Sequence, residues 1–77
     1  MSTVIETIDL TLYGCPMHYI KAREVLREMA LEQQILFALN KGNAVDEVIN
    51  SLREDGQLCE VESELTLITI INVVKKV

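Results

Sequence analysis

The 77-residue chain is poor in basic residues and in cysteine, and each shortage excludes a class of protein. Seven lysines and arginines stand against twelve aspartates and glutamates, which gives a formal charge of −5. Binding to the phosphate backbone needs a basic surface, so the composition argues against direct nucleic-acid binding. Two cysteines are fewer than a small secreted domain stapled by disulfides usually carries.

Long apolar runs are absent as well. The N-terminal residues 1–6 lack both the basic region and the apolar run of a secretory signal peptide. No segment approaches the roughly 20 apolar residues that a membrane-spanning helix needs. We therefore expect a cytoplasmic protein with reduced thiols and no membrane association.

Hydrophobic residues make up 49% of the chain, which predicts a folded globule. The length allows one domain over residues 1–77 with a single core. Hydrophobic periodicity predicts six elements. They are a strand over 4–10, a helix over 16–30, a strand over 34–39, a helix ending at 54, a strand over 57–63 and a strand over 67–74. Asn43 is predicted to cap the second helix and Gly56 to end it.

The element order βαβαββ predicts a two-layer α/β sandwich, with a four-stranded mixed sheet and both helices on one face. A helix lies in each of the first two connections, so those strand pairs can be parallel, whereas the short last connection makes an antiparallel pair. The last strand is apolar on both parities, because Ile68, Ile70 and Val74 alternate with other apolar residues. We expect another copy or a partner to cover the open sheet face.

Cys15 is followed directly by Pro16 where the strand pattern changes to a helix pattern. Proline suits the first turn of a helix, because its missing N–H would have no partner there. This places Cys15 at or next to the N-cap, where the helix dipole favours a thiolate over a thiol. The thiolate is the nucleophilic form of cysteine, so the sequence predicts a reactive sulfur at this position.

These residues, together with 8–10, Lys21-Ala22 and 51–56, resemble the TusA-like (SirA-like) family of small sulfur-carrier proteins. The resemblance covers nearly the whole chain and implies the βαβαββ fold. The family motif is Cys-Pro-x-Pro, and its cysteine carries sulfane sulfur as a persulfide. By resemblance that role falls on Cys15, with Pro16 as the first proline. The resemblance implies a sulfurtransferase-type carrier that meets donor and acceptor sulfur-transfer proteins and needs no cofactor.

The chain departs from the family pattern at three places. His18 replaces the second proline of the motif, Thr11 and Leu12 replace an arginine and a glycine, and Gly14 stands where many members have a larger residue. His18 has two functional interpretations, as a group that further lowers the pKa of the thiol or as a metal ligand. Cys-x-x-His supplies only two ligands, so no metal site is predicted. The favoured interpretation is a ring turned to solvent.

Three apolar residues near the motif lie off the buried face of the predicted helix or just before it: Tyr13, Met17 and Ile20. They are interpreted either as a docking collar around Cys15 or as scattered surface residues. Cys59 is interpreted as a small core residue, with a resolving thiol as the alternative.

Two other functions stay open. The first is a noncatalytic regulatory or protein-interaction module that keeps the fold. The second is a thiol-redox or metal-binding domain that uses Cys15, His18 and Cys59.

Overall fold

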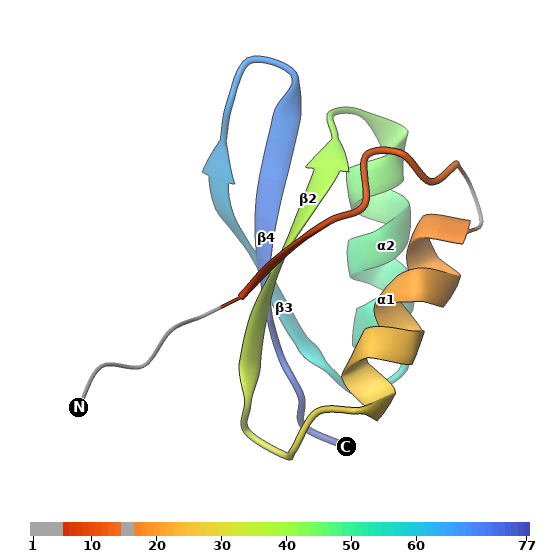
Figure 1. Ribbon diagram of the computed structural model, residues 1–77, viewed down its shortest axis with the longest axis vertical. Coiled ribbons are helices and arrows are strands. Elements are labelled where there is room, and N and C mark those ends of the chain that lie inside the picture. Colours follow the sequence, from red (N-terminus) through yellow and green to blue (C-terminus); the bar gives the residue numbers. More distant parts are fainter. Residues whose placement is uncertain (1–5, 15–16) are drawn as a thin grey trace.

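The computed structural model describes residues 6–14 and 17–77 (Figure 1). Its elements follow the predicted order: β1 (Thr7–Asp9), α1 (Met17–Arg27), β2 (Gln34–Asn40), α2 (Asn43–Glu54), β3 (Leu58–Glu64) and β4 (Ile68–Val74). The strands form one sheet, and both helices cover the same face of it. The predicted two-layer α/β sandwich is confirmed.

The strand order across the sheet is β1-β2-β4-β3. β1 pairs in parallel with β2, as the helical connection between them predicts. β4 lies antiparallel to both β2 and β3. The expected parallel pair between β2 and β3 is therefore wrong, because β4 is inserted between them.

The composition of the last two strands explains this order. β4 reads Ile-Thr-Ile-Ile-Asn-Val-Val and is well suited to a central position. β3 carries Glu60, Glu62 and Glu64, which would be costly between two other strands. Charged side chains on an edge strand also discourage pairing with a further strand. β3 therefore occupies the edge.

The helix ends differ from the prediction in two places. α2 begins at Asn43 itself and its N-cap is Gly42, so the assignment of Asn43 as the cap is wrong. Gly42 has a φ of 109°, a left-handed value that glycine adopts without a Cβ penalty. α1 ends at Arg27 rather than Ala30, and the Lys75 ammonium donates to the carbonyl oxygen of Met29 at 2.8 Å just beyond that end. At the end of α2, Gly56 has a φ of 99° and donates to the Arg53 carbonyl, as its predicted role requires.

One hydrophobic core fills the space between the helices and the sheet. Phe37 lies at its centre, on β2 between Ile8 of β1 and Ile71 of β4 in the strand register. The helices contribute a row of buried residues each, and Leu10 adds to the core from the segment after β1. These helical residues are Ala22 and Leu26 from α1 and Val45, Val48, Ile49 and Leu52 from α2.

The opposite face of the sheet carries Leu36, Ile70 and Val74, which are half-buried. Neither helix covers this face (Figure 1). The expectation that a second copy or a partner covers it stays a prediction.

Candidate functional site

The connection between β1 and α1 is folded around Asp9. One oxygen of its carboxylate accepts hydrogen bonds from the Thr11 backbone N–H at 2.8 Å and from the Thr11 hydroxyl at 2.6 Å. The side-chain amide of Asn40, at the end of β2, donates to the Thr11 carbonyl at 2.8 Å. Thr11, one of the departures from the family pattern, therefore ties the connection to the sheet.

The same two bonds, first the hydroxyl and then the backbone, hold the pKa of the Asp9 carboxyl below its ordinary value of 3.8. A carboxyl group whose pKa is lower in the folded protein than in the unfolded chain stabilises the fold at pH values above its unfolded-state pKa. This contribution is lost as the pH falls through the folded-state pKa. At neutral pH the Asp9 carboxylate is therefore ionised and accepts both hydrogen bonds from Thr11.

The connection reaches α1 through Gly14. The carbonyl of Gly14 accepts the N–H of His18 at 3.1 Å, which is the four-residue spacing of helical hydrogen bonds. A Cβ added at Gly14 would meet no atom within 4 Å outside the two adjacent residues, so there is open space beside this residue. Cys15 and Pro16, which follow Gly14 in the sequence, lie outside the described residues. The prediction that Cys15 faces the free amides of α1 therefore stays a prediction.

The first turn of α1, which begins at Met17, contains no acidic residue. Carboxylates are common at helix N-termini because they offset the positive end of the dipole. In this helix, the described part of the first turn has no carboxylate of its own, and the carboxylate of Glu47 on α2 lies 3.9 Å from His18. The arrangement favours an anion supplied from the preceding loop.

His18 is buried, with 4% of its surface exposed, so the expectation of a ring turned to solvent is wrong. Its Nδ1 accepts the backbone N–H of Tyr19 at 2.7 Å, and its Nε2 lies 3.9 Å from a carboxylate oxygen of Glu47 on α2. Within the described part of the chain, Nε2 has no hydrogen-bond partner. The ring fills the seam between the two helices. The spacing of His18 with buried Ala22 and Leu26, four residues apart in each step, is the sequence signal for this position.

Replacing His18 with alanine is therefore expected to lower the free energy of unfolding by about 1–3 kcal/mol, through lost packing between the helices. Met17→Ala removes an exposed neighbour and should change it by less than about 0.5 kcal/mol. Urea denaturation of both variants measures the difference. Equal, near-zero effects would mean that the ring does not pack in the seam.

The predicted docking residues all lie at the surface. Tyr13, Met17 and Ile20 are 37%, 48% and 39% exposed. Leu12, a departure from the family pattern, precedes Tyr13 in the chain, and its side chain is 92% exposed. Exposed apolar residues that are close together can mark an interaction site, so Leu12 joins the candidate docking residues.

The turn between β3 and β4 adds two more exposed leucines, Leu65 and Leu67. The carbonyl of Leu67 accepts the N–H of Lys41 at 3.2 Å, next to the residue that holds Thr11. Both loops are thus bonded to the end of β2. No local pattern in the sequence predicts these contacts, because they join residues that are far apart in the chain.

Cys59 is a free thiol buried in the core on β3, opposite Val73. Burial raises its pKa to about 11. The interpretation of Cys59 as a small core residue is confirmed. A buried thiol with this pKa is a poor nucleophile at neutral pH.

Over residues 6–14 and 17–77, no three His, Cys, Asp or Glu side chains are grouped so that they could hold a metal ion. Within those same ranges, no helix has the length and apolar character to cross a membrane.

Neither a family model nor a curated protein matches the sequence. The structure is similar to a solved one, the crystal structure of a SirA-like protein from Desulfitobacterium hafniense. The two superpose with a TM-score of 0.79 over 94% of this chain and 99% of that chain. The fold is SirA-like. The sequences are only 16% identical, so the likeness concerns the architecture, and it bears out the fold that the family resemblance implied.

Proposed function

We propose that this SirA-like protein carries sulfane sulfur as a persulfide on Cys15 and relays it from a donor protein to an acceptor. The observation that carries the proposal is the place of the Cys-Pro dipeptide, directly before α1 in a SirA-like fold. The first turn of that helix supplies a positive dipole end without a carboxylate in its described part. We further propose that residues 1–77 act as one cytoplasmic domain.

The relay consists of two exchange steps. The Cys15 thiolate attacks the outer sulfur of the donor persulfide, a new S–S bond forms on Cys15, and the donor leaves as a thiolate. A nucleophile of the acceptor then attacks the outer sulfur on Cys15, and Cys15 leaves as the thiolate. No net oxidation or reduction occurs, and no cofactor takes part. Thiolate stability at Cys15 favours it as a leaving group in the second step.

Access is the second requirement, because both partners must reach the same sulfur. The exposed side chains of Leu12, Tyr13, Met17 and Ile20 lie on either side of Cys15 in the sequence and give partners an apolar surface. Methionine adapts to different partners, which suits a protein that must dock on two of them in turn.

The proposal is tested by incubating the protein with a cysteine desulfurase and cysteine, followed by intact mass measurement. We expect a gain of one sulfur atom in the wild-type protein and in Cys59→Ala, and none in Cys15→Ala. Cys59→Ala is the matched control because it removes the other thiol. An adduct that persists in Cys15→Ala, or no adduct with any competent donor, would contradict the proposal.

A further inference from the structure

A cavity of about 320 Å³ opens at the far end of α1 from Gly14. It lies between the C-terminal half of α1, the turn after α2 and the segment after β4. In Figure 1, α1 descends from the connection that carries Gly14 toward the end of the molecule where the chain terminates. The cavity is therefore separate from the candidate sulfur site.

The cavity is basic although the chain is acidic. Three of the seven cationic residues of the chain line it, namely Arg23, Arg27 and Lys75. Among the described residues, Asp55 is the one acidic side chain in its lining, and Val77, the last residue of the chain, adds its terminal carboxylate. Because the whole chain has a formal charge of −5, this excess of positive charge is local.

The Asp55 side chain is already engaged. Asp55 accepts the hydroxyl of Tyr19 at 2.6 Å, and the same oxygen lies 3.7 Å from the Arg23 guanidinium. Arg23 in turn lies over the Tyr19 ring, 5.5 Å from its centroid. These contacts hold Arg23 in place at the cavity wall, with only part of its donor capacity used.

The other two cations have no carboxylate partner in the part of the chain that the structure describes. Lys75 donates to two backbone carbonyls, of Met29 at 2.8 Å and of Arg27 at 3.5 Å, which orient the ammonium without neutralising it. Arg27 lies four residues after Arg23 on α1, where like charges repel each other. An anion between them would relieve that repulsion.

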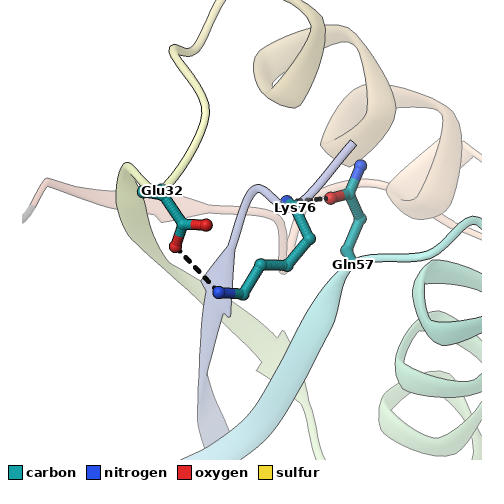
Figure 2. A network of polar contacts seen from close by, with 3 residues as sticks. All are labelled: Glu32, Gln57 and Lys76. Carbon is teal, nitrogen blue, oxygen red and sulfur yellow. Dashed lines mark hydrogen bonds and ion pairs between the residues drawn. The ribbon is translucent and has the colours of Figure 1, made fainter.

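Gln57 adds a neutral donor. Its side-chain oxygen accepts the backbone N–H of Lys76 at 2.8 Å, and Lys76 is itself paired with Glu32 at 2.8 Å (Figure 2). Figure 2 shows the amide nitrogen of Gln57 on the side away from Lys76. Since Gln57 lines the cavity, this NH₂ group is available to an acceptor there.

We infer that this cavity binds a small organic phosphate monoester. Two guanidinium groups, an ammonium and an amide NH₂ are all donors, and guanidinium groups match phosphate oxygens in pairs. Three cationic side chains outnumber the Asp55 and terminal carboxylates, and this net positive lining attracts a phosphate monoester, which carries about −1.5 to −2 at neutral pH. The volume is at the lower end for small-molecule sites, and the exposed side chain of Val77 offers an apolar contact to the organic part.

The inference is tested by titrating the full chain with glycerol 3-phosphate at low ionic strength and following backbone amide shifts by NMR. We expect saturable shifts at residues 23–27, 55–57 and 75–77, and none with glycerol. Arg27→Gln should weaken binding about tenfold or more, whereas Lys41→Gln, which removes the same charge outside the cavity, should leave it within about twofold.

Three results would overturn the inference. They are the absence of saturable shifts, equal weakening in Arg27→Gln and Lys41→Gln, and equal shifts with glycerol. Tighter binding of a phosphoserine peptide than of glycerol 3-phosphate would reassign the cavity to a protein partner. The spectrum of each variant also reports whether it is folded. The titration needs no sulfur on Cys15, so its result is independent of whether the protein relays sulfur.

Discussion

Replacing Phe37 with alanine is expected to remove about 3–5 kcal/mol from the free energy of unfolding. Phe37 is fully buried in the middle of β2 and is flanked on the inner face by strands on both sides. A domain of this size has a total stability of about 4–12 kcal/mol, so the loss is a large part of it. The melting temperature should fall by about 15–30 °C.

Thermal and urea denaturation followed by circular dichroism measure this effect. Leu12→Ala is the matched control, because it also removes a large apolar side chain but one that is 92% exposed. It should change the free energy of unfolding by less than about 0.5 kcal/mol. A loss below about 1 kcal/mol in Phe37→Ala would show that the core is not centred on this ring.

The order of elements and the packing of both helices on one sheet face were predictable, because each element carries its own hydrophobic period. Which strands lie next to each other in the sheet was harder to predict. The competition between β3 and β4 for the central place is settled by which strand better tolerates burial on both sides. β4 is apolar on both parities and β3 carries three glutamates, so this signal was present in the sequence.

The helix caps and His18 show where local patterns mislead. Asn43 is a good capping residue by type, but Gly42 takes the position because the chain turns there with a φ of 109°. A histidine in a first helical turn is usually well solvated, yet His18 lies on the row of Ala22 and Leu26 and is carried into the seam with α2. Both outcomes depend on how elements meet in space.

The candidate site was predictable in part. The placement of Cys15 and Pro16 before a helix follows from proline chemistry, and the exposure of Met17 and Ile20 follows from the helical pattern. The attachment of the Thr11 loop and of the Leu67 turn to Asn40 and Lys41 depends on hydrogen bonds between segments far apart in the sequence. The basic cavity likewise joins three segments far apart in the sequence.

The two thiols are expected to differ in alkylation rate at pH 7 by about 100-fold or more. With a pKa of about 11, Cys59 is a thiolate in about one molecule in ten thousand, and it is shielded by the core as well. An ordinary exposed thiol is ionised to a few per cent at this pH, and a thiol at a helix N-terminus more so. Treatment with iodoacetamide, followed by mass mapping of each cysteine over time, gives both rates.

The central claim is that the fold presents Cys15 as a stabilised thiolate, and the pH dependence of its alkylation tests this most directly. Cys59→Ala leaves Cys15 as the one thiol in the chain, so the rate can be followed without mapping. We predict a midpoint clearly below the free cysteine value of about 8.5. A midpoint at or above that value would contradict the account and would favour an interaction module that has the SirA-like fold without the sulfur chemistry.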